Sequence, residues 1–318
     1  MRYNLNSGWG QSLSASLPLG LTGKIFVVGD SGTANLDMIK ELFGYDPDGK
    51  LRYFATIDAA VSACTASAGD IILVAPGHTE ALSDATSLNL DVAGISIIGL
   101  GNGSNRPTIT LDTATTATIP ASAANITIKN MIFTANFADI VSFFTLTTAK
   151  NFKLEGNYFK ATAASMNSKY IVDTNTTTND AEGLSLVNNV WIEPDTATLS
   201  AVKMDGDNSN VEIKGNFFNL GVNNNTAAIM AIITGKSVFS AQIVGNLVYR
   251  LNTDTATGAI LVTTDQSDNS GIIADNFAQH ADTAAELLVT ATSGFGVFDN
   301  KASGVAGASG YLLPAADS

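Results

Sequence analysis

Apolar and polar residues alternate in short stretches that recur along this chain. The stretch "NFKLEGNYFKAT" at 151–162 returns in altered form as "NVEIKGNFFNLG" at 210–221 and as "SAQIVGNLVYRL" at 240–251. In each copy the alternation leads to a Gly-Asn pair, and large apolar residues follow. Alternation with a period of two is typical of a β-strand with one buried face and one exposed face. The pattern therefore predicts a repeated unit made of a strand and a turn.

The pattern occurs eight times between residues 94 and 301, and successive copies are 24 to 32 residues apart. Its anchor positions are Leu100, Met131, Asn157, Asn189, Asn216, Asn246, Asn276 and Asn300. A second short apolar run, such as "KYIVDTN" or "SAVKMDG", lies between successive copies, so each repeat holds at least two strands. A period of this length indicates a stacked-repeat architecture. We predict an all-β, single-stranded parallel β-helix of about eight coils, rising by roughly 4.8 Å per coil.

The recurring asparagines have a structural explanation in such a stack. The residue that ends the strand must turn the chain sharply, often through a left-handed conformation that Gly and Asn adopt most easily. One position then recurs in register from coil to coil, so that side-chain amides can bond to each other. We expect a ladder formed by Asn157, Asn189, Asn216, Asn246, Asn276 and Asn300.

Large aromatic residues follow the turn in several repeats. Phe159, Trp191, Phe218 and Phe277 are the predicted core aromatics, since burial is the largest energetic return for such side chains. Tyr158 and Phe217 also follow the turn, and the group is expected to enter the core or to stack. The functional alternative is an aromatic platform that binds sugars.

Composition and charge narrow the classes of function. The chain of 318 residues has a net charge of −13 without a run of Lys or Arg, so nucleic acid is not expected as a partner. The single Cys64 excludes an internal disulfide and a cysteine zinc cluster, and it is interpreted as a small buried hydrophobe. No signal peptide and no apolar run of 18 residues are found, so we expect synthesis in the cytoplasm and no membrane span.

Residues 53–82, "YFATIDAAVSACTASAGDIILVAPGHTEAL", carry a specific resemblance. A short amphipathic helix, a Gly-Asp turn, an apolar strand and a Gly turn resemble the entry into right-handed parallel β-helix proteins of the pectate-lyase-like superfamily. There the helix caps the open end of the first coil. The resemblance implies a right-handed solenoid over 53–301, with a cap helix at about 56–65, a leader at 1–52 and a tail at 302–318.

The same resemblance suggests two kinds of function. Enzymes of this superfamily cut acidic polysaccharides, whereas many phage members are tailspikes, fibres or head-decorating subunits. The leader ahead of the cap also resembles phage structural proteins, which implies a virion protein with the major capsid protein and other virion proteins as partners. A homo-oligomer, with a trimer as the expected form, is the implied assembly.

Candidate catalytic residues were sought for the enzyme alternative. A lyase of this kind needs carboxylates for Ca²⁺ beside a Lys or Arg base, and a glycosidase needs two carboxylates in one cleft. The closest pairs are Asp205 with Asp207, Asp265 with Asp268, and Glu193 with Asp195, and the nearby bases are Lys203 and Lys214. Asp prefers turns, and Gly206 separates the first pair. We therefore interpret these acids as solvated turn residues, and the lysines as charge balance.

Other catalytic patterns are weaker still. The two histidines, His78 and His280, lie near opposite ends of the predicted solenoid, and no G-x-S-x-G motif occurs. The glycines of "GLGNGSNRP" at 99–107 open no helix and are interpreted as a coil turn. The sequence thus predicts a non-enzymatic phage virion protein, a capsid-surface decoration subunit, without catalytic, cofactor or metal residues. A tail fibre or tailspike, a glycan-binding adhesin and a polysaccharide lyase or depolymerase are the alternatives.

Overall fold

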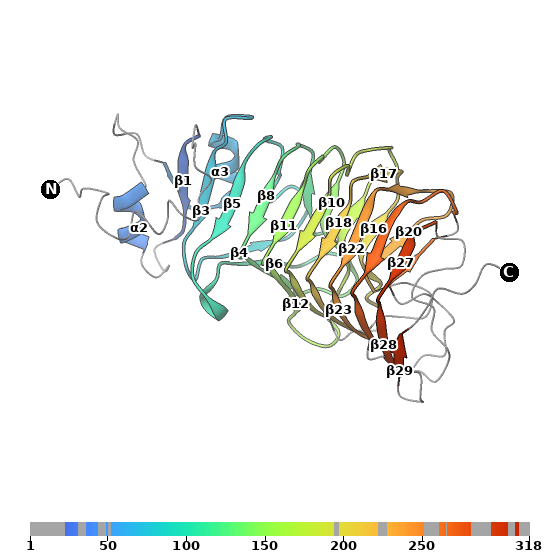
Figure 1. Cartoon of the computed structure of the whole chain (residues 1–318). Helices are drawn as coiled ribbons and strands as arrows, with labels where there is room; N and C mark the ends of the chain where they lie inside the picture. The colour runs from blue at the N-terminus through green and yellow to red at the C-terminus, as the bar shows by residue number, and fades with distance from the viewer. Residues whose placement is uncertain are drawn as a thin grey trace, which may run out of the picture.

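The computed structural model describes residues 23–30, 36–43, 49, 52–193, 197–221, 228–250, 261–264, 266–280, 294–304 and 309–311. In these residues the chain winds into a parallel β-solenoid of about eight turns, which forms an elongated rod (Figure 1). Three long sheets run along the rod. Between residues 96 and 263 each turn contributes a strand to sheet 1, then to sheet 2, then to sheet 3, whereas the described residues of the first and last turns contribute strands to sheets 1 and 2.

The strands of each sheet follow in chain order, except that β1 lies between β2 and β3 in sheet 1. Sheet 1 holds β1 (Ile25–Val28), β2 (Tyr53–Phe54), β3 (Ile71–Val74), β5 (Ser96–Gly99), β8 (Thr127–Lys129), β11 (Lys153–Glu155), β14 (Ser185–Val187), β18 (Glu212–Lys214), β22 (Ala241–Val244), β25 (Gly271–Ala274) and β27 (Gly296–Phe298). Sheet 2 holds β4 (Thr79–Leu82), β6 (Thr108–Leu111), β9 (Ile132–Ala135), β12 (Tyr158–Ala161), β15 (Val190–Glu193), β19 (Phe217–Leu220), β23 (Leu247–Arg250), β26 (Phe277–His280), β28 (Lys301–Gly304) and β29 (Ser309–Tyr311).

The other strands complete the coils. Sheet 3 holds β7 (Ile119–Ala121), β10 (Ile140–Leu146), β13 (Ser168–Thr174), β16 (Ser200–Met204), β20 (Met230–Ile232) and β24 (Val262–Thr263), and β17 (Asn208–Ser209) pairs with β21 (Val238–Phe239). Pairing is parallel in every described strand pair except β28 with β29. The predicted tail therefore contributes to sheet 2, because its residues 309–311 fold back on β28.

The core fills the space between the three sheets. In sheet 1 alternate residues point inward and form one apolar row along the rod: Ile72, Ile97, Ile128, Leu154, Leu186, Ile213, Ile243 and Ile273. β10 and β13 each bury two consecutive apolar residues, Phe143 with Phe144 and Ile171 with Val172. Within the repeats, each strand turns one face toward the core and the other outward. This explains why apolar and polar residues alternate there with a period of two.

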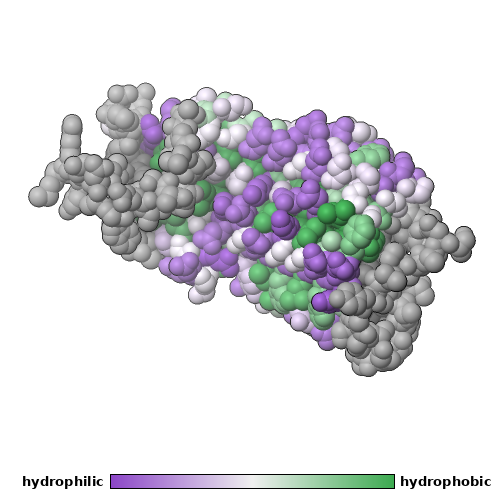
Figure 2. Space-filling view, in the orientation of Figure 1, coloured by the Kyte–Doolittle hydropathy of each residue, from purple (hydrophilic) through white to green (hydrophobic). Residues whose placement is uncertain are grey.

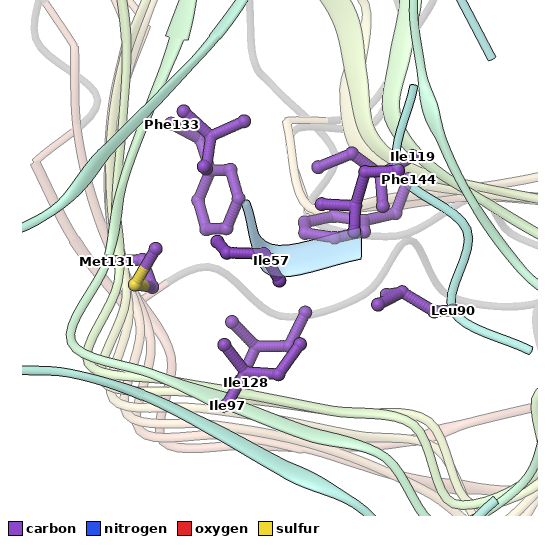
Figure 3. A pocket seen from close by; sticks show the side chains of 10 residues that line it. Ile57, Leu90, Ile97, Ile119, Ile128, Met131, Phe133 and Phe144 are labelled. Atoms are coloured by element: carbon purple, nitrogen blue, oxygen red, sulfur yellow. The ribbon is translucent and has the colours of Figure 1, made fainter. Parts of the chain in front are cut away.

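Two helices of four residues or more lie in the described part of the chain, both near its N-terminal end. The helix α3 (Ile57–Ala63) begins after Thr56, whose hydroxyl accepts a hydrogen bond from the Ala59 amide at 3.3 Å. Ile57 of α3 points into the space between the inner side chains of the first coils (Figure 3). A small apolar cavity of about 10 Å³ remains there, close to the volume that one water needs, and its lining is apolar. α3 thus covers the open end of the core, slightly shorter than the predicted 56–65.

The predicted leader is part of the same sheet. β1 lies between β2 and β3 and is hydrogen-bonded in parallel register to both, for example Val27 to Tyr53 and to Leu73. The helix α2 (Leu36–Phe43) packs through Leu36 and Ile39 in a second, smaller apolar cluster with Val27. Sheet 1 therefore begins within the leader, upstream of the predicted start of the solenoid at residue 53.

Candidate functional site

The corner between sheets 1 and 2 carries the predicted asparagines. The residue before each asparagine has a positive φ, for example 65° at Gly156, 54° at Asn188 and 55° at Asp275. This left-handed residue turns the chain, and the asparagine that follows points into the stack. Gly, Asn and Asp share this corner because they adopt a positive φ most readily.

The six asparagines form a continuous ladder. The Nδ2 of each donates to the Oδ1 of the next: Asn157 to Asn189 at 3.2 Å, Asn189 to Asn216 at 3.1 Å, Asn216 to Asn246 at 2.9 Å, Asn246 to Asn276 at 2.9 Å and Asn276 to Asn300 at 2.8 Å. Each Nδ2 also donates to a backbone carbonyl one coil back, such as Asn216 to Leu186 at 2.9 Å. The Met131 amide, at an anchor position without asparagine, donates to Asn157 Oδ1 at 3.0 Å. The ladder is part of the core, where its amides have partners on both sides.

The predicted core aromatics divide into two groups. Phe159, Trp191 and Phe218 are completely buried and occupy the second position after the ladder asparagine. Phe277 is not a core residue, which corrects the prediction: it occupies the first position after Asn276, which faces outward, and Ala278 takes the inner position. Its ring centroid lies 6.5 Å from that of Tyr249, and Tyr249 lies 5.7 Å from Phe217. These three partly exposed rings follow one another on the outer face of sheet 2.

The structure separates the acids that the sequence places in pairs. Asp205 is bonded to Lys203, whereas Asp207 Oδ1 accepts from the Ser237 amide at 2.8 Å. Asp268 accepts from the Ser237 hydroxyl at 2.6 Å, and Glu193 is completely buried. Asp195 and Asp265 lie outside the described residues.

One cluster of ionisable side chains remains as a candidate functional site. It lies on sheet 3, where Asp173 of β13 is in register with Lys203 of β16. Lys203 Nζ lies 3.3 Å from Asp173 Oδ1 and 2.5 Å from Asp205 Oδ2, and it lies 5.8 Å from the centre of the Tyr170 ring. The three charged side chains are 14 to 22% exposed. We call Tyr170, Asp173, Lys203 and Asp205 the sheet 3 cluster.

The protonation states of the sheet 3 cluster follow from burial and from its own charges. Burial raises the pKa of Asp173, and the neighbouring Asp205 charge adds to this rise, while Lys203 opposes it. Burial lowers the pKa of Lys203, but its hydrogen bond to Asp205 and the two carboxylate charges outweigh burial, so that the pKa is raised overall. The pKa of Tyr170 is raised as well, chiefly by burial. Lys203 is therefore protonated at neutral pH.

These states limit the chemistry that the cluster can perform. A lyase base must be able to accept a proton from the substrate near the working pH. Lys203 cannot do so, because the two carboxylates hold its proton in place. The carboxylates are in turn occupied by the same ammonium group. The arrangement is that of an ion pair that neutralises charge on a sheet surface.

Asp173 and Tyr170 were not predicted from the sequence as partners of Lys203. A signal was present in the second apolar run of each repeat, because aligning "YIVDT" at 170–174 with "SAVKM" at 200–204 places Asp173 opposite Lys203. Lys214, the other predicted base, lies on the outer face of sheet 1 and is exposed. The sheet register therefore brings one of the two predicted lysines next to carboxylates.

The surroundings of His78 and Cys64 indicate structural rather than catalytic roles. His78 is buried, and its Nε2 lies 2.7 Å from Glu80 Oε1, which also accepts from the Ile57 amide at 2.7 Å. This contact ties β4 to the first residue of α3. The side chain of His280 lies outside the described residues, but its strand β26 is far from β4 in sheet 2. Burial and the Asp70 charge raise the pKa of the Cys64 thiol to about 12, which disfavours the reactive thiolate.

Within the described ranges, no group of three or more His, Cys, Asp or Glu residues could hold a metal ion. In the same ranges, no helix has the length and apolar character to cross a membrane.

Comparisons with known proteins give one distant likeness. No protein family matches the chain, and no curated protein sequence matches it. Among solved structures a rhamnogalacturonan lyase is similar, with 11% sequence identity over 92% of this chain and 90% of that one, at a TM-score of 0.36. A likeness this distant says nothing about the chemistry of the present chain.

Proposed function

We propose that this chain is a non-enzymatic structural protein, a rigid rod that serves as a subunit on the surface of a phage capsid. The observation that carries the proposal is the ladder, which joins six successive coils from Asn157 to Asn300 through the core. Each coil is also bonded to its neighbours by sheet 1. Such a stack resists bending and keeps its outer positions at fixed places, as a lattice contact requires.

Two further arguments support a structural role in a particle. In the sheet 3 cluster, Lys203 is paired with both carboxylates, so none of the three charged groups is left to act on a substrate. The phage assignment rests on the resemblance of the cap segment at 53–82 and of the leader, with the major capsid protein as the expected partner.

The copy number in particles tests this function. Particles from the source are purified on a gradient, and quantitative mass spectrometry gives the ratio of this chain to the major capsid protein. We expect a ratio that corresponds to a regular array over the head. A few copies per particle would instead assign the chain to a tail fibre or tailspike, and absence from particles would overturn the structural proposal.

The leader gives a second test of the same function. A chain that lacks residues 1–22 is offered to particles in competition with the full chain. If the leader contacts a neighbouring virion protein, the truncated chain will be displaced. Incorporation at full occupancy would contradict this role of the leader.

A polysaccharide lyase is the second candidate, and the sheet 3 cluster is the observation in its favour, since it joins a lysine to two carboxylates. The chain is incubated with Ca²⁺ and an acidic polysaccharide, and unsaturated ends are measured by ultraviolet absorbance. We expect none, because Lys203 is protonated. Product that disappears in Asp205→Ala would favour the lyase over the structural role.

A further inference from the structure

Equivalent surface positions change character along the rod. One register position near the end of each sheet 1 strand lies beside the corner. It holds Leu73 and Ile98 in the first coils, and then Lys129 and Glu155, whose charged groups lie 2.8 Å apart. In the last five coils it holds mostly apolar residues: Val187, Lys214, Val244, Ala274 and Phe298. The fold does not require apolar residues there, because the same position holds charge at Lys129 and Glu155.

The equivalent position on the other side of the corner holds Thr79 and Thr108 in the first coils, and from Ile132 on it is apolar or aromatic except at Lys301. It is the first residue of each sheet 2 strand, and from β15 on it holds Val190, Phe217, Leu247, Phe277 and Lys301. The two rows together form an apolar strip along the corner of the rod, which we call the corner stripe. Phe298 is 56% exposed and the adjacent Ile272 is 41% exposed. Figure 2 shows apolar surface over these C-terminal coils, beside a more polar surface over the middle coils.

Charged residues also lie in the corner stripe, at Lys214 and Lys301, and between its two rows, at Asp275 and Asp299. Lys214 lies one coil before the coil of β22 and β23, and Asp275 lies one coil after it. Both side chains are exposed, and within the described residues neither has an ion-pair partner in its own chain. The coil between them carries Val244, Gly245 and Leu247 at the stripe.

We propose that the corner stripe binds a second copy of this chain, with the two rods antiparallel and a two-fold axis through the coil of β22 and β23. This axis reverses the order of the coils, so Lys214 of each copy meets Asp275 of the other at both ends of the contact. It also places Phe217 opposite Phe277, and Val187 opposite Phe298. Leu247 faces its own copy on the axis. The three central coils of the stripe are thus complementary to themselves in charge and in apolar surface, while Lys301 and Asp299 of the last coil lie opposite the uncharged Val190 and Asn188.

Two rods packed in parallel would not bring these opposite charges together. An axis along the rod relates residues at equal height, so Asp275 would face Asp275 and Asp299 would face Asp299 across the contact. Both are exposed corner residues with positive φ. Like charges at an interface oppose association. The charge pattern therefore favours an antiparallel dimer over the trimer that the resemblance implies, and it does so independently of a role in a particle.

The oligomeric state tests the stripe. Light scattering after size exclusion should give twice the chain mass of 32.9 kDa for the full chain at low salt. Lys214→Glu places like charges together and should weaken association by about tenfold or more, as should Asp275→Lys. The combined exchange should restore association relative to Asp275→Lys alone, and both variants carry the same backbone strain at residue 275. A monomer, a trimer, or a dimer indifferent to these exchanges would overturn the proposal.

Crosslinking tests the antiparallel orientation. Phe217→Cys and Phe277→Cys are prepared as separate proteins, and each is treated with a thiol crosslinker shorter than two coil heights, roughly 10 Å. We expect a covalent dimer when the two variants are mixed, and little when either is treated alone, with the natural chain as the control for Cys64. Dimers from each variant alone would show equal heights across the contact and would overturn the antiparallel arrangement.

Discussion

A ladder asparagine uses its whole amide group. Asn216 Nδ2 donates to the Leu186 carbonyl and to Asn246, while its Oδ1 accepts from the backbone and side-chain amides of Asn189. Aspartate has no amide hydrogen to donate, and alanine offers neither donor nor acceptor. The side chain satisfies groups of three coils at once, and its loss leaves buried polar groups without partners.

We expect Asn216→Ala to lower the free energy of unfolding by about 2 to 4 kcal/mol, because several buried groups lose their partner together. Urea denaturation followed by circular dichroism measures the change. Asn219→Ala in the following strand β19 is the matched control, since the Asn219 Oδ1 has no hydrogen-bond partner within the described residues. An equal effect of both substitutions would show that the ladder adds nothing beyond packing.

The sheet 3 cluster predicts a dependence of stability on pH. The folded chain holds the Lys203 proton more tightly than the unfolded chain, so this contribution is present below about pH 10 and is lost as the pH rises through the raised pKa. In Lys203→Met this loss of stability at alkaline pH should be absent. The substitution also removes the positive charge that opposes the raised pKa of Asp173, so relative to the natural chain the variant should lose stability at pH 7 and recover part of it as the pH falls toward about 4.

Urea unfolding from acid to alkaline pH measures the free energy of unfolding of Lys203→Met and of the natural chain, and so tests both predicted effects. Lys150→Met serves as the control, because Lys150 is half exposed and pairs with Glu182 at the surface. If the variant and the natural chain lose stability in parallel above pH 10, Lys203 does not hold its proton as described.

At the scale of elements, the short helix α3 determines how the solenoid begins. Its residues Ile57, Ala60 and Val61 are buried against the first coils, and Glu80 accepts the Ile57 amide. The core of a solenoid is open at its ends, and a capping element must cover the apolar side chains there. α3 has seven residues, too few to be stable alone, so its stability comes from this packing.

Ile57→Ala should therefore destabilise the chain by about 2 to 5 kcal/mol, since it enlarges the apolar cavity below the helix. Ile233→Ala, at a position 36% exposed, should change stability by less than about 1 kcal/mol. Thermal unfolding followed by circular dichroism compares the two. A similar loss in both variants would mean that α3 does not protect the core.

The elements also show which features a sequence of this kind predicts. The strands beside the corner and the ladder asparagines follow from local alternation and from a turn that only a few residue types permit. Phe277 was misplaced because a shift of one residue after Asn276 changes its face. The sheet 3 cluster was missed because it joins residues of different coils, Asp173 and Lys203, across loops of variable length. The entry of β1 into sheet 1 depends on pairing with β3, which no local pattern of the leader encodes.

At the scale of the molecule, stability is distributed along one dimension. Each strand of sheet 1 is bonded to the strands before and after it, and few contacts reach further along the rod. For such stacks, the free energy of unfolding is close to the sum of the intrinsic stability of each coil and the interaction energy between adjacent coils. Coils in the middle have two neighbours, whereas terminal coils have one, so the ends should open first.

Hydrogen exchange measured by mass spectrometry tests this one-dimensional coupling. We expect the slowest exchange in β11, β14 and β18, and faster exchange toward β1 and β27. Asn216→Ala should then speed exchange in its own coil and the two adjacent ones, while β3 and β5 keep their protection, because coupling passes only from neighbour to neighbour. Equal acceleration over the whole rod would instead show that the solenoid unfolds as one cooperative unit. The effect of a substitution on exchange would then not depend on the coil in which it is made.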